Sequence, residues 1–252
     1  MIKLNIQALS KVGMVRDNNE DMVSLGGILL RDGEMTFPIV LDEESQFCLL
    51  VADGMGGHEH GERASQGLLE HLNDCFKNDL FHADTLEDEL RSQVKAFSDQ
   101  LNQEAMEERQ SRPMGCTLTG FVWSHGKTLL LNAGDSRTYR YRDGILRRIT
   151  QDDTMRDITG NPYESKALLN CVGGGAQCDL MVVDFSQRLL NNDTILICSD
   201  GLTDMLGDEE IELILSESPN PVEELYDAAC ERGGVDNVSI IIAKLTFYIT
   251  YS

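Results

Sequence analysis

An apolar run that ends at a carboxylate and a cluster of glycines is the feature that most constrains how this chain can fold. The run from Phe47 to Ala52 predicts a buried strand, and Asp53 follows it directly, with three glycines between Gly54 and Gly57. Glycine has no side chain to cover the backbone, so the junction exposes a carboxylate beside an accessible carbonyl. Oxygen ligands of this kind suit Mg²⁺ or Mn²⁺. Short glycine motifs also occur as plain turns, and this stretch alone favours a turn.

Three further aspartates stand beside glycine or asparagine, each directly after or before a predicted strand. They are Asp135, Asp200 and Asp236. Together with Asp53 they can converge only if the strand ends lie along one edge of a sandwich, where unpaired carboxylates would repel one another strongly. Bound cations would remove that repulsion. Because no histidine or cysteine accompanies the aspartates, the predicted ligands are all oxygen, which favours Mg²⁺ or Mn²⁺ over Zn²⁺.

Hydrophobic periodicity predicts an α+β fold in which strands pack on strands and helix pairs lie outside. Strand patterns occupy residues 2–9, 22–30, 35–41 and 47–52. The last three are expected to form an antiparallel meander, with Arg31-Asp32-Gly33 as a tight turn. Helical stripes follow at residues 64–76 and 90–109, and a second helix pair is expected at 209–215 and 221–229. Later strand patterns occupy residues 116–123, 128–131, 138–142, 145–149, 179–185, 193–198 and 238–245.

The segment from about residue 150 to residue 178 has no periodicity, and irregular segments of this length usually serve function or mobility. We find no internal repeat, linker or low-complexity tract elsewhere. The 252 residues are therefore predicted to form a single domain, 1–252, with residues 150–178 as a short flap.

Charge and cysteine content restrict the partners and the compartment. Asp and Glu outnumber Lys and Arg by 43 to 21, so a net charge of -22 disfavours nucleic acid and anionic membranes. The seven cysteines form no C-x-x-C pair and lie mostly in apolar runs, as expected of buried thiols in a reducing compartment. The amino end does not resemble a signal or transit peptide, and no apolar run approaches the ~20 residues of a membrane helix. A cytoplasmic location is predicted.

A polar segment near the amino end brings a cation and acids close together. Arg16 precedes Asn19, Glu20 and Asp21, so an anion clamp and an acid could meet in one place. An Asn- and Asp-rich turn between strands is the alternative, and the segment in isolation favours it.

Six short strings can be read along the chain in a fixed order. They are R-D-N-N-E-D (16–21), D-G-M-G-G-H (53–58), G-C-T (115–117), N-A-G-D-S-R (132–137), S-D-G-L-T-D (199–204) and G-G-V-D-N-V-S (233–239). In order and approximate spacing they resemble the PP2C-type (PPM family) metal-dependent Ser/Thr protein phosphatases, and the second string resembles the bacterial branch. Each string alone is weak, but six in order are specific. The resemblance covers about residues 8–245 and implies a four-layer αββα sandwich, with two antiparallel sheets flanked by antiparallel helix pairs.

The resemblance also implies a metal centre. Asp53 would bridge two Mn²⁺ or Mg²⁺ ions, and the Gly54 carbonyl would bind one of them. Asp200 and Asp236 would complete the ligands of the first ion. Asp135 with Asp200 would form a looser third site.

The implied activity is hydrolysis of phosphoserine and phosphothreonine in proteins, with Arg16, Asp21 and Asp53 as catalytic residues. A water shared by the two ions would attack phosphorus directly. Arg16 would hold the substrate phosphate, so that its charge and that of the metals offset charge on the phosphoryl oxygens. Asp21 would act mainly through metal-bound water. The implied partners are phosphorylated proteins and a paired Ser/Thr kinase.

The chain departs from the family pattern at Thr150-Gln151-Asp152-Asp153-Thr154, where relatives often have T-x-D-H-S. His58 and His60 lie near the site in sequence and could supply a proton to the leaving group, although a water could serve equally well. Fold alone leaves an alternative function open. The chain could be a regulatory protein of this fold, either a pseudo-enzyme or a partner-switching phosphatase that acts on one small phosphorylated regulator.

Overall fold

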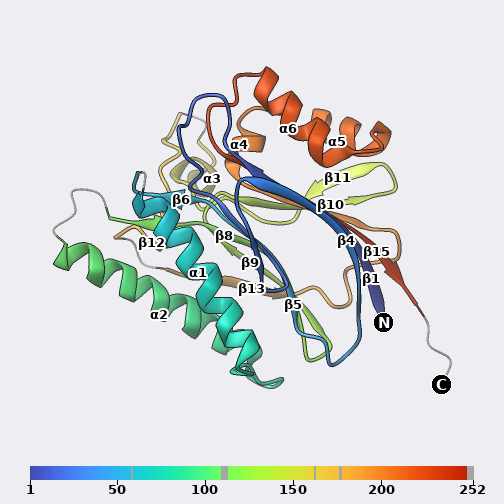
Figure 1. Ribbon diagram of the computed structural model, residues 1–252, viewed down its shortest axis with the longest axis horizontal. Coiled ribbons are helices and arrows are strands. Elements are labelled where there is room, and N and C mark those ends of the chain that lie inside the picture. The colour runs from blue at the N-terminus through green and yellow to red at the C-terminus, as the bar shows by residue number, and fades with distance from the viewer. Residues whose placement is uncertain (58, 109–112, 162, 176–177, 249–252) are drawn as a thin grey trace.

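Two six-stranded antiparallel sheets stack face to face in the computed structural model, which describes residues 1–57, 59–108, 113–161, 163–175 and 178–248 (Figure 1). One sheet has the order β11 (Ile145–Arg148), β10 (Arg137–Arg142), β14 (Thr194–Cys198), β15 (Val238–Phe247), β1 (Ile2–Lys11) and β4 (Gly33–Leu41). The other has the order β13 (Met181–Asp184), β9 (Lys127–Ala133), β8 (Leu118–Ser124), β5 (Phe47–Ala52), β2 (Met22–Leu25) and β3 (Ile28–Leu30). A small third sheet contains β12 (Val172–Gly173), β7 (Gly115–Cys116) and β6 (Gly54–Met55).

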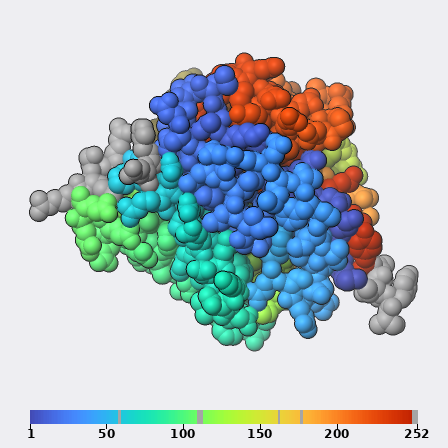
Figure 2. All heavy atoms as spheres, in the orientation of Figure 1, coloured from blue at the N-terminus to red at the C-terminus, as the bar shows by residue number. Residues whose placement is uncertain are grey.

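Helix pairs cover the outer faces of the two sheets. The pair α1 (Glu59–Lys77) and α2 (Leu86–Glu107) lies on the sheet that contains β5, and the pair α5 (Asp208–Glu217) and α6 (Pro221–Glu231) lies on the sheet that contains β1 (Figure 1). Figure 2 shows the two pairs on opposite sides of the N-terminal strands. Two short helices, α3 (Met155–Thr159) and α4 (Asp200–Thr203), lie in connecting segments. Among the described residues, no helix combines the length and the apolar character that crossing a bilayer requires.

Three hydrophobic clusters separate the four layers, which explains why the central strands are apolar on both faces. In β5, Leu49 and Val51 pack between the sheets, whereas Leu50 packs under α1 and α2. In β15, Ile241 packs between the sheets and Ile242 packs under α5 and α6. Full burial of each such side chain stabilises the fold by about 1.5–3 kcal/mol. The predicted αββα sandwich is confirmed, and six of the seven cysteines are buried as expected.

The predicted meander is wrong, because residues 35–41 pair with neither of its other two segments. Residues 22–30 form two short strands that turn at Gly26-Gly27, and β2 pairs with both β3 and β5. The strand β4 pairs instead with β1 in the opposite sheet, so Arg31-Asp32 carries the chain from one sheet to the other. The apolar face of β4, which includes Phe37, is thereby packed against the core between the sheets. A short-range turn signal cannot reveal this choice, because both pairings satisfy the same alternating pattern.

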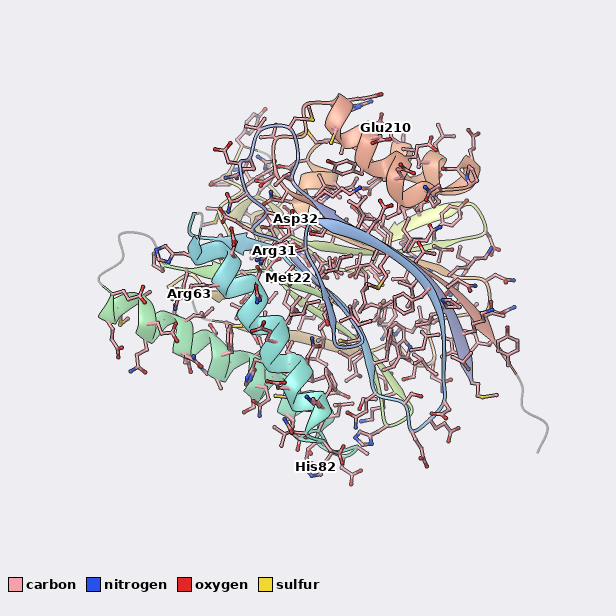
Figure 3. The ribbon with its side chains drawn as sticks, in the orientation of Figure 1. Met22, Arg31, Asp32, Arg63, His82 and Glu210 are labelled. Atoms are coloured by element: carbon pink, nitrogen blue, oxygen red, sulfur yellow. The ribbon has the colours of Figure 1, made fainter. Side chains whose placement is uncertain are left out.

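Arginines in this region tie the layers together near the amino end of α1 (Figure 3). The Arg31 guanidinium donates to the carbonyl of Asp21 at 3.0 Å and to the carbonyl of Glu62 at 3.2 Å. Arg63 extends from α1 toward α2, where its guanidinium lies 3.2 Å from a carboxylate oxygen of Glu104. The Arg31 contacts hold the segment that ends at Asp21 against α1, and the Arg63 contact joins α1 to α2.

The irregular segment 150–178 is anchored at its base by a buried ion pair. The Asp152 side chain is 4 % exposed, and its Oδ2 lies 2.7 Å from the Arg137 guanidinium. The Arg148 guanidinium approaches the other oxygen of Asp152 at 3.1 Å. Beyond this base the described part of the segment contains only α3 and β12 as regular elements. The absence of periodicity in the sequence therefore corresponds to a largely irregular path.

Candidate active site

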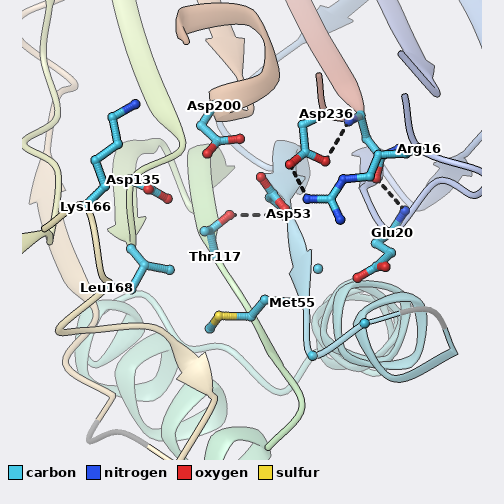
Figure 4. Close-up of a pocket in the computed structure, with 14 residues that line it drawn as sticks. Arg16, Glu20, Asp53, Met55, Thr117, Asp135, Lys166, Leu168, Asp200 and Asp236 are labelled. Carbon is cyan, nitrogen blue, oxygen red and sulfur yellow. Dashed lines mark hydrogen bonds and ion pairs between the residues drawn. The ribbon is translucent and has the colours of Figure 1, made fainter. Parts of the chain in front are cut away.

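The ends of four core strands meet around one pocket (Figure 4). Asp53 follows β5, Asp135 comes shortly after β9, Asp200 follows Ser199 at the end of β14 and begins α4, and Asp236 precedes β15. All four aspartates line a pocket of about 360 Å³, together with Arg16. The antiparallel sandwich brings these residues to the same edge although they are far apart in the chain.

Burial and like charge raise the pKa values of these carboxyl groups. Burial, followed by the charges of Asp21 and Asp200, holds the pKa of Asp53 well above its ordinary value. Burial and then the charge of Asp200 raise the pKa of Asp135 to about 7. Burial and then the charge of Asp204 raise the pKa of Asp200. A cation among these acids would relieve their repulsion, since opposite charge favours the ionised form.

Close approach of backbone segments explains two of the glycines beside these aspartates. A Cβ on Gly54 would lie 2.3 Å from the Gly61 carbonyl oxygen and 2.4 Å from that of Glu20. A Cβ on Gly201 would lie 1.9 Å from the carbonyl oxygen of Asn237. Because no side chain fits at either position, glycine lets the end of β5 lie against α1 and the Glu20 segment, and lets α4 lie against the segment before β15. Gly54 also lines the pocket.

The loop that carries Arg16 is fastened to the loop that carries Asp236. The Arg16 guanidinium donates to Oδ2 of Asp236 at 2.6 Å, and this contact raises the pKa of Arg16. Asn237 links the same loops, since its Oδ1 accepts from the N–H of Glu20 at 2.9 Å and its Nδ2 donates to the Asn18 carbonyl at 2.8 Å. The cation and the acids predicted from separate strings therefore lie side by side.

Asp21 lies behind this wall and is not among the described residues that line the pocket. Its Oδ2 accepts from the Ser199 hydroxyl at 2.8 Å, whereas its buried Oδ1 has no hydrogen-bond partner within the described chain. Burial, more than any neighbour, raises the pKa of Asp21 to about 7. A buried carboxylate oxygen without a partner is costly unless a water or cation reaches it. Its action through water stays a prediction.

The donor chemistry of the pocket fits a divalent cation. Every candidate ligand is a carboxylate or carbonyl oxygen, which is the set that Mg²⁺ and Mn²⁺ prefer. Within the described chain, no three acidic, imidazole or thiol side chains are already gathered as a ready-made metal cluster. The oxygens of Asp236, for instance, accept from Arg16 and from the N–H of Asn237. The other acids nevertheless repel one another, and one buried oxygen of Asp21 has no hydrogen-bond partner within the described chain. Both features are expected beside a bound cation.

Comparison with known proteins agrees with this geometry. The sequence profile of the family described as Protein phosphatase 2C matches residues 36–233. This chain belongs to the protein phosphatase 2C family. It is a protein phosphatase, as the resemblance predicted, and the relatives it is similar to include bacterial serine/threonine phosphatases.

Two relatives show how far the similarity to this phosphatase extends. The serine/threonine phosphatase stp of Listeria monocytogenes is 30% identical over 252 residues, which cover 92% of each chain. The serine/threonine protein phosphatase PstP of Mycobacterium tuberculosis is 32% identical over 262 residues, which cover 97% of this chain and 46% of PstP.

Solved structures share the fold of this phosphatase over nearly its whole length. The catalytic domain of PstP, solved in complex with two manganese ions, has a TM-score of 0.75 and 30% identity and covers 98% of this chain and 100% of that one. PppA of Pseudomonas aeruginosa has a TM-score of 0.76 and 28% identity and covers 96% of this chain and 97% of that one. Divalent-metal dependence follows for this family member.

Several residues that line the pocket of the phosphatase were not predicted as site residues. Thr117 fixes the backbone of Asp53, since its Oγ1 accepts from the Asp53 N–H at 3.0 Å and its own N–H donates to the Asp53 carbonyl at 2.9 Å. Glu20 and Lys166 also line the pocket. Thr117 and Glu20 stand inside the strings that carried the resemblance, which could have identified them. Lys166 lies in the irregular segment, where no sequence pattern points to it.

The departure from the family pattern near residue 153 has a structural counterpart. Oδ2 of Asp153 accepts from the N–H of Gly134 at 2.9 Å and from Nδ2 of Asn170 at 2.7 Å, so it ties the loop before Asp135 to the irregular segment. His60 lies in the first turn of α1 and is not among the described residues lining the pocket. His58 lies outside the described residues, so its proposed proton transfer stays a prediction.

Proposed function

We propose that this phosphatase hydrolyses phosphoserine and phosphothreonine in proteins with two divalent cations, Mn²⁺ or Mg²⁺. Asp53 would bridge the ions, the Gly54 carbonyl would bind one, and Asp200 and Asp236 would complete the ligands of the first. The observation that carries the proposal is the convergence of four strand-end aspartates with Arg16 on one pocket. The two manganese ions in the PstP structure support the metal count.

The chain's own groups would bind and orient the phosphoester. Arg16 can grip two phosphoryl oxygens because its guanidinium is a planar fork of donors. Bound divalent cations supply an activated water and positive charge against the phosphoryl oxygens. In the hydrolysis, the water oxygen forms a bond to phosphorus and the bond from phosphorus to the seryl or threonyl oxygen breaks. A proton from the water passes to that oxygen, so the products are the free hydroxyl and inorganic phosphate. Thr117 would hold the backbone of Asp53 in place through two hydrogen bonds. The Asp53 N–H donates to Oγ1 of Thr117, and the Thr117 N–H donates to the Asp53 carbonyl.

The proposal extends to the setting of the reaction. Residues 1–252 would form one phosphatase domain, Asp135 and Asp200 would offer a third and weaker cation site, and Asp21 would act through an intervening water. The substrates would be phosphorylated by a paired Ser/Thr kinase in the cytoplasm. The acidic surface implied by a net charge of -22 supports a protein partner over nucleic acid or an anionic membrane.

The proposed function is tested by Mn²⁺-dependent release of phosphate from p-nitrophenyl phosphate and from a phosphothreonine peptide. The wild-type protein should be active on both, EDTA should abolish both activities, and Asp200→Asn should lower both by about a hundredfold or more, because it removes a charge from the pocket. Full activity of Asp200→Asn under Mn²⁺ would overturn the assignment of metal ligands. Activity on a single protein substrate alone would indicate a partner-switching phosphatase instead.

Arg16→Ala is expected to raise the KM for a phosphopeptide about tenfold and to lower kcat by about tenfold or more, because the phosphate loses a two-pronged donor. Steady-state kinetics with the phosphothreonine peptide measure both changes. Arg63→Ala is a matched control, because both arginine side chains form ion pairs and are about equally exposed. The exposed fraction is 51% for Arg63 and 50% for Arg16. An unchanged KM in Arg16→Ala would remove Arg16 from the phosphate site.

A further inference from the structure

The irregular segment contributes a lysine to the acidic side of the pocket. Lys166 lines the pocket, and its ammonium group contacts Oδ1 of Asp204. In Figure 4, Lys166 and Arg16 lie on opposite sides of Asp53 and Asp200. The Lys166 side chain is 50% exposed, so the contact forms at the mouth of the pocket rather than deep in the protein.

Three carboxylates gather where Lys166 enters. Asp204 lies one turn of α4 after Asp200, and its N–H donates to the Asp200 carbonyl at 2.7 Å. The charge of Asp204 raises the pKa values of both Asp200 and Asp135, which shows that the three acids act on one another. The charge of Lys166 works in the opposite direction and offsets part of the rise in the pKa of Asp200 that burial and neighbouring acids cause. Among the described residues that line the pocket, Lys166 brings an ammonium group to the acidic trio of Asp135, Asp200 and Asp204.

We propose that the Lys166 ammonium is the resident cation of the acidic trio and weakens the third cation site there, so that the phosphatase binds two divalent ions tightly and a third weakly or not at all. The inference rests on the proposed function, because it assumes two divalent ions at Asp53, Asp200 and Asp236. Lys166 acts on the third ion and not on the pair of ions proposed for catalysis.

The contact of Lys166 with Asp204 and its positive charge both disfavour a third ion. A divalent cation bound to Oδ1 of Asp204 would lie about 2.0–2.1 Å from that oxygen and would compete with the ammonium group for the negative charge of the same carboxylate. The two cations would also repel each other at that range. A third ion therefore binds the acidic trio more tightly when the Lys166 side chain withdraws, and the ion pair between Lys166 and Asp204 opposes that withdrawal.

The test counts bound ions rather than turnover. Purified full-length protein is titrated with Mn²⁺, and free Mn²⁺ is followed by electron paramagnetic resonance. Wild type should bind two ions tightly and a third weakly or not at all. Lys166→Met keeps the aliphatic stem and removes the charge, so it should bind the third ion about tenfold or more tightly than wild type. Lys166→Arg keeps the charge and should behave as wild type.

Two further variants separate the local effect from the effect of net charge. Lys95→Met makes the same change in net charge at an exposed, ion-paired lysine on α2, and it should leave the ion count at the wild-type value. Asp204→Asn in the Lys166→Met background should remove the gained ion. Lys166→Gln provides the same readout if Lys166→Met does not fold.

Equal third-ion affinity in wild type, Lys166→Met and Lys166→Gln would overturn the inference, as would the same gain in Lys95→Met. If wild type and the Lys166 variants all bind two ions, the role of Lys166 is rejected and the proposed two-ion function is not. A wild-type protein that binds no Mn²⁺ at all would reject the proposed two-ion function as well.

Discussion

Asp53→Asn is expected to lower kcat for Mn²⁺-supported phosphate release by about a thousandfold or more while the chain stays folded. Asparagine keeps the shape of the side chain but removes the charge at the centre of the pocket. Both hydrogen bonds to Thr117 use the backbone of Asp53, so the strand end keeps its place. Loss of one like charge also relieves the repulsion from Asp200 and its neighbours, so the metal-free variant should be at least as stable as wild type.

Three measurements on Asp53→Asn check this expectation: kcat with the phosphothreonine peptide, Mn²⁺ affinity by titration, and the melting temperature in EDTA. Asp88→Asn is the control for a change of one charge, because the Asp88 side chain on α2 is 88% exposed. More than a tenth of wild-type activity in Asp53→Asn would show that Asp53 does not bridge the ions.

The metal-free protein is expected to lose stability as the pH rises from about 4 to about 7, and added Mn²⁺ should restore it. The reason is that three carboxyls that line the pocket and Asp21 behind it have raised pKa values in the folded chain. Burial and neighbouring acids raise the pKa values of Asp21 and Asp135 from 3.8 to about 7, and those of Asp53 and Asp200 move in the same direction.

The sign follows from proton binding. Below pH 3.8 these carboxyls are protonated in both the folded and the unfolded chain, so they do not affect the difference in stability. As the pH rises above that value the unfolded chain releases its protons first, and the folded state is progressively disfavoured until the pH passes about 7. Asp21 alone accounts for a loss on the order of 3–4 kcal/mol across that range. A divalent cation that binds only the folded chain counteracts the loss.

Urea unfolding in EDTA and in excess Mn²⁺, at several pH values between about 4 and 7.5, measures this effect. In EDTA, Asp21→Asn should make the free energy of unfolding depend less on pH than in wild type, because the amide does not titrate. Glu34→Gln on the exposed edge strand should leave it unchanged, because the Glu34 side chain is 63% exposed. Constant stability across the range in EDTA, or no gain from Mn²⁺ at neutral pH, would contradict the expectation.

Local sequence patterns were sufficient for most elements of the fold. The six-residue apolar run of β5 and the stripe of Leu90, Val94 and Leu101 on α2 are buried as predicted. Their periodicity depends only on residues a few positions apart, and burial on one face or both leaves a direct record in the sequence. The partner of β4 could not be derived in this way. An alternating strand fits either sheet, and the core between the sheets determines which one it joins.

The sequence by itself determined the residue types of the site and placed each acid at a strand end, because Asp and Gly must stand where a strand stops and the backbone is exposed. Only the tertiary structure decided which of those groups share the pocket. It placed Asp21 behind the wall, paired Arg16 with Asp236 and brought Lys166 to Asp204. These contacts join segments tens to hundreds of residues apart, so they depend on how all the layers pack and have no counterpart in any local pattern.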